Sequence, residues 1–307
     1  GTFNVESGAY AMFIGEDAGD QAGGSIDGAG DVDGDGSGDL LIGARNAEWS
    51  TKSNQGMVYL ILGTVSGVND LSTADAIYYG EDSTQYLGWN VGFAGDLYSN
   101  GKDSLVMSAP YTDVGTTNSG RVYVVKGSST FYGTNNISSV AETIINGEST
   151  SSYLGYTLND GGGTDAGDVD GDGSDDLIIA SAHHNGARGR TYLYYGDLTT
   201  GTLNASSADV KWSGANSSSY FGAGVGGVGD INDDGYDDIL VGAYNVTSTA
   251  SYQGGAFLYL GGSSLAATGT TTAATAAFYG EKASDNLGST IGTPGDINND
   301  GLYDMTV

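Results

Sequence analysis

The sequence predicts an all-β protein, and within that class a β-propeller of four-stranded blades. Three observations predict this fold. First, an acidic, glycine-rich motif recurs five times along the 307 residues, at intervals of 65, 72, 62 and 66 residues. Second, short runs rich in β-branched and aromatic residues lie between the motifs and are bounded by Gly, Asn, Asp or Ser. Third, no window keeps a 3.6-residue apolar period, so almost no helix is expected.

Each repeat has the same order of segments. An aromatic or apolar run that ends in Gly, such as 78–80, is followed by a pair of an apolar residue and Gly, such as 87–88. The acidic motif comes next, then an apolar run such as 40–42 and an alternating run such as 57–61. Four strands per repeat are therefore expected. The expected repeats are approximately 17–80, 81–147, 148–213, 214–280 and 281–307, of which the last is incomplete.

The repeat length selects a propeller among all-β folds. A four-stranded unit of about 60–65 residues cannot bury both faces of its sheet alone, whereas units placed around one axis bury them against each other. A parallel β-helix has much shorter coils, and sandwich domains need about 100 residues each. One propeller region over 1–307 is expected, and the longest interval is explained by an insertion at 158–165 that contains three consecutive glycines.

The composition excludes several classes of function. The chain has 9 Lys and Arg against 38 Asp and Glu, a net charge of −29, so no clustered basic surface for nucleic-acid phosphates is expected. Without cysteine there is no disulfide scaffold and no zinc–thiolate site. No run of about 18 apolar residues is present, so no membrane span is expected in this segment.

The acidic motif, D-x-[DN]-x-D-G-x-x-D, predicts calcium sites. Positions 1, 3 and 5 of a tightly curled loop direct side-chain oxygens to one point, and Gly at position 6 permits the sharp turn. Position 7 offers a backbone carbonyl, and the Asp at position 9 completes the set. Donors that are all oxygen favour Ca²⁺ over transition metals, and Mg²⁺ resists such an all-protein cage. The predicted ligands are Asp31, Asp33, Asp35, Ser37, Asp39, Asp168, Asp170, Asp172, Ser174, Asp176, Asp230, Asn232, Asp234, Tyr236, Asp238, Asp296, Asn298, Asp300, Leu302 and Asp304.

The acidic motif has two alternatives to four bound Ca²⁺ ions. An EF-hand needs Glu at position 12, where this chain has apolar residues in strand-like runs, and it is rejected. A metal-free acidic turn is the other alternative, although unneutralised carboxylates this close would repel each other. The second copy, Asp96–Ser104, has Tyr98 at position 3, so no Ca²⁺ is expected there. Lys102 at its position 7 either supplies local positive charge or is a solvated side chain.

Enzyme chemistry is not expected. His183 and His184 are the only histidines, and as neighbours along a strand they would face opposite sides. No G-x-S-x-G, HExxH or P-loop motif is present, and carboxylate pairs such as Asp175 and Asp176 belong to the acidic loops. Among the tryptophans, Trp212 is expected in the core, and Trp49 is the best candidate for an exposed aromatic platform.

Taken together, these motifs resemble the FG-GAP repeat of integrin α-subunit propellers and their bacterial and archaeal relatives. Phe221-Gly222 matches "FG" literally, and Ser108-Ala109-Pro110 is the nearest match to "GAP". The resemblance implies a propeller, normally of seven blades, with Ca²⁺ in the loops between the first two strands of a blade. It also implies an extracellular or cell-surface location and a role in adhesion or binding.

The chain departs from that pattern in holding about five repeats. Residues 11–16 resemble the last strand of a preceding unit, and the last repeat stops after its acidic loop. Either the chain is part of a longer polypeptide, or an open blade is completed by another chain. The expected function is an adhesion or binding module for protein or glycan partners. The alternatives are a subunit of an extracellular filament or surface layer, closed by self-association, and a lectin.

Overall fold

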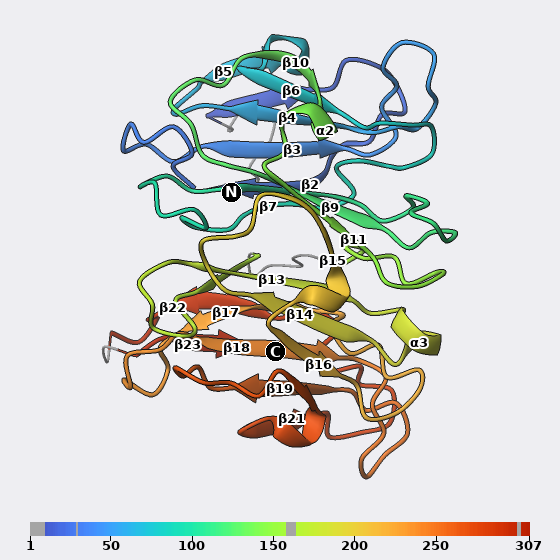
Figure 1. Cartoon of the computed structure of the whole chain (residues 1–307), viewed down its shortest axis with the longest axis vertical. Coiled ribbons are helices and arrows are strands. Elements are labelled where there is room, and N and C mark those ends of the chain that lie inside the picture. The colour runs from blue at the N-terminus through green and yellow to red at the C-terminus, as the bar shows by residue number, and fades with distance from the viewer. Residues whose placement is uncertain (1–9, 29, 158–163, 300–301) are drawn as a thin grey trace, which may run out of the picture.

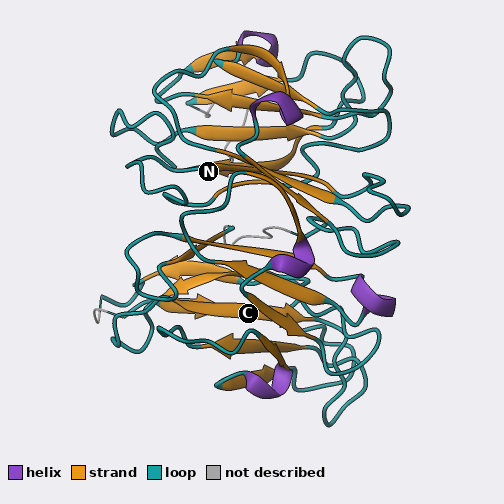
Figure 2. Ribbon diagram, viewed as in Figure 1, coloured by secondary structure: helices purple, strands orange, loops and turns teal. Residues whose placement is uncertain are grey.

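The computed structural model describes residues 10–28, 30–157, 164–299 and 302–307. Small antiparallel sheets follow each other along the molecule, with β3 and β4 near one end of its long axis and β19 and β21 near the other (Figure 1). Strands joined by loops dominate and the helices are single turns (Figure 2). The predicted all-β propeller fold is confirmed. Of the predicted insertion at 158–165, residues 158–163 lie outside the described residues.

Four blades are complete in this chain. The first has β2 (Ala22–Gly28), β3 (Leu40–Ala44), β4 (Met57–Ile61) and β6 (Ala76–Tyr79), and the second has β7 (Val91–Phe93), β8 (Leu105–Ala109), β9 (Arg121–Val125) and β11 (Thr143–Asn146). The third has β12 (Asp165–Gly167), β13 (Asp176–Ser181), β14 (Arg190–Tyr194) and β16 (Val210–Ser213), and the fourth has β17 (Val225–Gly229), β18 (Asp238–Ala243), β19 (Gly255–Tyr259) and β21 (Ala276–Tyr279). Parts of two more are β1 (Ala11–Ile14) before the first blade and β22 (Gly292–Gly295) with β23 (Asp304–Thr306) after the fourth.

A fifth strand in each repeat corrects the expectation of four. These extra strands are β5 (Gly67–Asp70), β10 (Gly133–Asn136), β15 (Gly201–Asn204) and β20 (Thr268–Thr270). Each leaves its own blade and pairs in parallel with the last strand of the preceding one, as β10 does with β6 and β20 with β16. Their sequences are polar and Gly-containing, so no local strand signal reveals them. They are strands because they pair with the edge strand of the neighbouring blade.

A capped turn returns each extra strand to its own blade. The turns are η1 (Leu71–Thr73), α2 (Ile137–Val140), η2 (Ala205–Ser207) and η3 (Thr271–Ala273). Before each, a side-chain oxygen accepts a hydrogen bond from an amide two residues on, as Asn136 does from Ser138 and Asn204 from Ser206. Such caps end a strand and start a turn without apolar residues. The chain thus links every blade to its predecessor.

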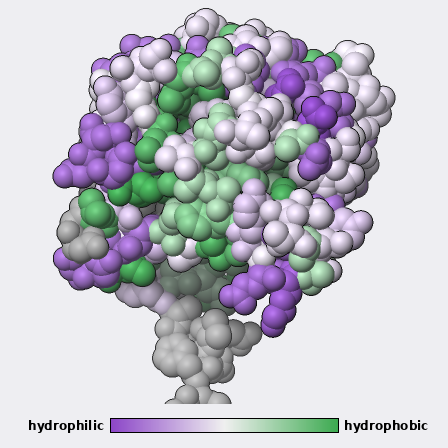
Figure 3. Space-filling model, turned by 90° about the horizontal axis from the view of Figure 1, so that it is seen from below, coloured by the Kyte–Doolittle hydropathy of each residue, from purple (hydrophilic) through white to green (hydrophobic). Residues whose placement is uncertain are grey.

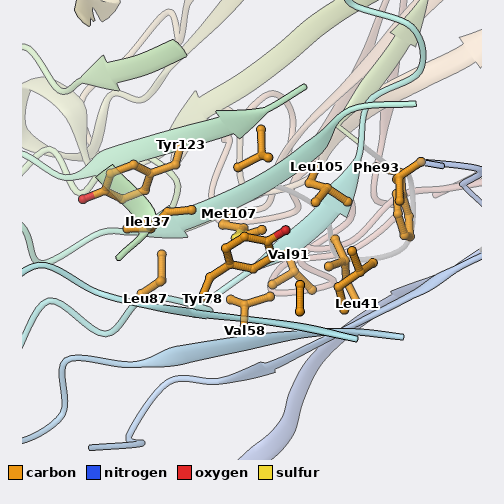
Figure 4. Packing of buried hydrophobic residues seen from close by; sticks show 14 of the residues in the cluster. Leu41, Val58, Tyr78, Leu87, Val91, Phe93, Leu105, Met107, Tyr123 and Ile137 are labelled. Carbon is orange, nitrogen blue, oxygen red and sulfur yellow. The ribbon is translucent and has the colours of Figure 1, made fainter. Parts of the chain in front are cut away.

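The core lies between neighbouring sheets rather than within one. Figure 4 shows Tyr78 and Val58 of the first blade packed against Met107 and Val91 of the second, all of them 0–2% exposed. This packing confirms that each sheet buries its faces against its neighbours. It also explains the apolar–Gly pair of each repeat, because Gly88 has a φ of +78° and a Cβ there would lie 2.6 Å from the carbonyl oxygen of Met57.

The outer edge of β21 differs from the equivalent edges. Within the described ranges no strand pairs with it, and Phe278 is 37% exposed, whereas its first-blade equivalent Tyr78 is 2% exposed beneath β10. Seen from below, the end of the molecule that carries β21 has hydrophobic residues across its middle and hydrophilic ones around them (Figure 3).

None of the helices described here is long and apolar enough to cross a bilayer.

Candidate functional site

Five acidic loops join the first strand of a blade to the second, all at the same edge of their sheets. They are acidic loop 1 (31–39), loop 2 (96–104), loop 3 (168–176), loop 4 (230–238) and loop 5 (296–304). Asp300 and Gly301 are outside the described residues, so loop 5 is known only in part.

The first Asp of loops 1 to 4 builds the curl of its loop. In loop 1, Asp31 Oδ1 accepts hydrogen bonds from the amides of Gly34 (2.8 Å) and Asp35 (3.1 Å), and Oδ2 accepts one from Gly36 (2.9 Å). Asp96 of loop 2 caps its own loop in the same way. The curl therefore needs only this Asp, which explains why the second copy keeps it although it has lost other acidic positions.

Carboxylates converge in loops 1 and 3. Oxygens of Asp31, Asp33 and Asp39 lie within 4.8 Å of one another, and so do oxygens of Asp168, Asp170 and Asp172. Like charges at this separation repel strongly in the absence of a cation. A set of oxygen donors only, arranged on a tight loop, fits a divalent cation such as Ca²⁺.

The remaining predicted ligands are less convergent. Asp35 Oδ1 accepts the Ser37 amide at 2.7 Å, and Asp35 does not join the cluster of loop 1. Among its described residues, loop 4 forms no group of three clustered acids; Asn232 at its position 3 donates to Asp234 Oδ2 at 3.0 Å. The twenty-residue ligand set stays a prediction.

The Asp at position 9 has a role that the sequence did not reveal. Asp39 Oδ2 accepts the Val32 amide (2.9 Å) within the loop, and Oδ1 accepts the Gly63 amide (2.8 Å) beyond β4. Asp176 and Asp238 repeat both bonds in blades three and four. Burial raises the pKa of Asp176 to about 8. Position 9 thus ties loops 1, 3 and 4 to the far end of the third strand of their blades.

Lys102 does not serve its own loop. Its ammonium donates to the backbone carbonyl of Asp33 in loop 1 and lies against Gly34. The equivalent residues also touch the preceding loop: the Ser174 hydroxyl lies 2.9 Å from that of Ser99, and the Tyr236 ring lies over Gly171. The positive charge of Lys102 therefore lies at loop 1, and its ammonium is not simply solvated.

The opposite edge of the sheets carries a continuous row of rings. Its members come from loops that precede the first strand or follow the second strand of a blade, so they face away from the acidic loops. This aromatic row consists of Tyr86, Trp89, Tyr111, Tyr153, Tyr156, His183, Tyr220 and Tyr244. Neighbouring ring centroids are 4.9–6.4 Å apart from Trp89 to Tyr244. The row runs from the second blade through the third to the fourth.

Three members of the row share one backbone conformation. Tyr86, Tyr153 and Tyr220 have φ values of +57°, +50° and +53°, which bulky L-residues rarely adopt. Gln21 and Asn286 hold the same place in the first and fifth repeats with φ values of +57° and +56°, so this conformation belongs to the turn of the repeat. Each Tyr directly precedes the apolar–Gly pair of its repeat, and this repeated triplet is the signal that could have revealed the row.

The two histidines face different surroundings, as expected. His183 belongs to the aromatic row, where burial lowers its pKa. His184 lies 3.8 Å from Glu148, and burial followed by the charge of Arg190 lowers its pKa to about 4. Trp212 is buried and stacked on Tyr259, which confirms it as a core residue.

Trp49 is 39% exposed, as expected, but it stacks on Tyr79 and is not part of the row.

Comparison with known proteins connects the chain to one family. Residues 22–61 match the family model described as "FG-GAP repeat". Integrin alpha-5 of Xenopus laevis is 29% identical over 181 residues, 58% of this chain and 16% of the integrin. Integrin alpha-8 of Mus musculus is 29% identical over 190 residues, 59% of this chain and 15% of that protein. For integrin alpha-V of Gallus gallus the identity is 32% over 91 residues, 28% of this chain and 9% of that protein. The chain therefore spans about a sixth or less of the length of these curated relatives.

Proposed function

We propose that this integrin α-like FG-GAP propeller is a calcium-stabilised binding module that acts outside the cell or at its surface. It holds a protein or glycan partner on the face formed by the aromatic row. The observation that carries the proposal is the concentration of eight rings on one face. Aromatic side chains offer large, rigid contact area and are enriched at binding interfaces.

Calcium has a structural role in this proposal. Loops 1, 3, 4 and 5 each take one Ca²⁺, and Asp96–Ser104 takes none. Each ion neutralises its carboxylates and holds the hairpin between the first two strands, and an ion that binds only the folded state stabilises it by mass action. Affinities of about 10⁻⁴–10⁻³ M are typical of extracellular calcium modules. Because the chain has no cysteine, these ions take the place of disulfides.

The site supports binding rather than catalysis. A general base needs a pKa near the working pH, and burial lowers the pKa of both histidines. The aromatic row offers contact surface without a nucleophile and base in hydrogen-bond reach among its described members. The proposal therefore includes no enzymatic activity.

A matched pair of variants tests the proposed face. The purified chain is applied with 2 mM Ca²⁺ to a glycan array and to a panel of extracellular-matrix proteins. The double variant Tyr153→Ala/Tyr220→Ala removes one ring of the row from blade three and one from blade four. It should no longer bind the partners that the wild type binds. Tyr132→Ala removes a ring that is 77% exposed near the acidic-loop edge and should change nothing. Equal binding by both variants would overturn the proposal.

A second candidate is a subunit of an extracellular filament or surface layer that would use the outer edge of β21. A strand from a neighbouring copy would add in parallel to β21 as β10 adds to β6, covering Phe278 and Tyr279. A following repeat of the same polypeptide would cover the edge equally well. Light scattering and electron microscopy decide, since a monomeric particle at all concentrations rejects the filament.

A further inference from the structure

A cavity of about 510 Å³ lies at the first-blade end of the aromatic row. Arg45 follows β3 of the first blade, and Tyr86, Trp89 and Tyr111 come from the loops around β7 and β8 of the second. Amide side chains complete the lining, among them Asn118. A volume of this size, with aromatic walls and a few polar groups, is typical of small-ligand sites.

Arg45 is held in one orientation inside this cavity. Its guanidinium carbon lies 4.4 Å from the centroid of the Trp89 ring, and its Nε donates to Gln21 Oε1 at 2.7 Å. Stacking and this bond fix the plane of the guanidinium while its two terminal nitrogens remain as donors. The side chain is thus preorganised to present a fork of N–H groups.

Arg45 has no carboxylate within 4.0 Å in the described part of the chain. By contrast, Arg121 pairs with Glu81 at 2.5 Å and Arg190 pairs with Glu148 at 3.0 Å. In a protein with 38 acidic and 9 basic residues, an arginine fixed in a cavity without an acidic partner is available to a ligand anion. Arginine forks match carboxylates in a bidentate way.

We infer that this cavity binds an acidic sugar, a glycan unit that carries one carboxylate. The carboxylate would meet the Arg45 fork, the apolar face of the sugar ring would pack on the tyrosine rings, and the amides of Asn46 and Asn118 would bond its hydroxyls. A neutral sugar would leave the arginine unpaired, and a densely charged polyanion would be repelled by the net charge of −29. The inference rests on the proposed function and names its ligand class.

Calorimetric titration of the calcium-loaded protein tests the inference with defined probes. Glucuronate should bind at least tenfold more tightly than glucose. Arg45→Met keeps an unbranched side chain over Trp89 but removes the charge, and it should weaken glucuronate binding at least tenfold. Lys126→Met is the matched control, because Lys126 also lies over a ring, 5.2 Å from that of Tyr98 near the acidic loops, and its loss should not affect binding.

Three outcomes would overturn the inference: no binding of glucuronate by the wild type, equal binding by Arg45→Met, or tighter binding of an acetylated aspartyl tripeptide, which would assign the cavity to acidic peptides. If Arg45→Met does not fold, competition between glucuronate and glucose on the wild type decides alone. Array partners that depend on Tyr153 and Tyr220 but not on Arg45 would leave the proposed function standing while this inference fails.

Discussion

Asp103 of acidic loop 2 accepts a 2.7 Å hydrogen bond at Oδ2 from the backbone amide of Asp31 in acidic loop 1. Its own amide donates to the carbonyl of Asp31 at 3.1 Å. The same side-chain bond links Asp175 to Asp96 at 2.7 Å and Asp237 to Asp168 at 2.8 Å. Position 8 of each of these loops therefore fixes the backbone of the first residue in the preceding loop, so neighbouring acidic loops are joined by direct hydrogen bonds.

Asp103→Ala should lower the free energy of unfolding by about 1–2 kcal/mol, because it leaves a part-buried amide without an acceptor. The apparent Ca²⁺ affinity of loop 1 should fall with it, since Asp31 loses its anchor. Urea unfolding and calcium titration measure the two effects.

Asp17→Ala removes an exposed carboxylate away from the acidic loops and is the control. Unchanged stability and affinity in Asp103→Ala would show that the blades are held by packing alone.

Removal of divalent ions by EDTA should lower the melting temperature by several degrees. At 2 mM Ca²⁺ and a Kd of about 0.1–1 mM, each occupied loop contributes about 0.6–1.8 kcal/mol. Asp168→Asn should reduce the number of bound ions from four to three by equilibrium dialysis.

Asp96→Asn, the same change at the same position of loop 2, should leave that number unaltered. If EDTA leaves the melting temperature unchanged, the proposed structural role of calcium is contradicted.

Lys102→Ser should tighten Ca²⁺ binding at loop 1 by about three- to tenfold, because a monovalent charge beside the loop opposes a divalent ion through partly screened Coulomb repulsion. Ser is the residue at the same position of loop 3. Calcium titrations of Lys102→Ser are compared with and without the added change Asp31→Asn. The binding that disappears with Asp31→Asn is assigned to loop 1. Lys126→Ser serves as the comparison, and weaker binding by Lys102→Ser would mean that the ammonium braces the loop instead.

The sequence predicts the blades well but not their connections. The apolar run of β8 and the β-branched and aromatic run of β9 predict strands, and the repeat length predicts that these strands form a propeller. The strand β10 has no such signal, because its register comes from the exposed edge of β6 in the preceding blade.

The candidate site likewise has a part that the sequence predicts and a part that it does not. The acidic positions 1, 3 and 9 are local in sequence and were predictable as one loop. The contact of Lys102 with Asp33 crosses 69 residues, and the rings of Tyr111 and Tyr153 come from different repeats. Only the radial stacking of blades brings these groups together.

Stability should fall as pH rises toward neutrality, and Asp165 is a main cause. Burial raises the pKa of Asp165 to about 7 from an ordinary value of 3.8. Between these two values the folded state binds more protons than the unfolded state, so the free energy of unfolding decreases with pH. Asp165→Asn keeps the acceptor for the Gly167 amide and removes the titration. Urea unfolding at pH 5 and pH 8 in saturating Ca²⁺ should show a pH-dependent loss smaller by about 2 kcal/mol in the variant; an identical loss would mean that the carboxylate is solvated.

The contact between the first and second blades is charged, whereas the equivalent contact between the third and fourth blades is apolar. Glu81 at the end of the first blade accepts hydrogen bonds from Arg121 (2.5 Å) and from the Tyr123 hydroxyl (2.6 Å) of the second. Between the third and fourth blades the equivalent of Glu81 is Ala215, and that of Tyr123 is Phe257. The acid and the hydroxyl thus disappear together.

Glu81→Ala alone should lower the free energy of unfolding by about 1–3 kcal/mol, because it leaves a buried hydroxyl without an acceptor and a partly buried guanidinium without its carboxylate, with only the bond from its Nε to Asn146 remaining. Adding Arg121→Ala and Tyr123→Phe should recover at least half of that loss, since the triple variant removes the groups left unpaired and makes this contact apolar, as it is between the third and fourth blades. Chemical denaturation of the three proteins gives both values. If the triple variant is less stable than Glu81→Ala, the three groups do not act as one unit, and the paired change at Ala215 and Phe257 has another cause.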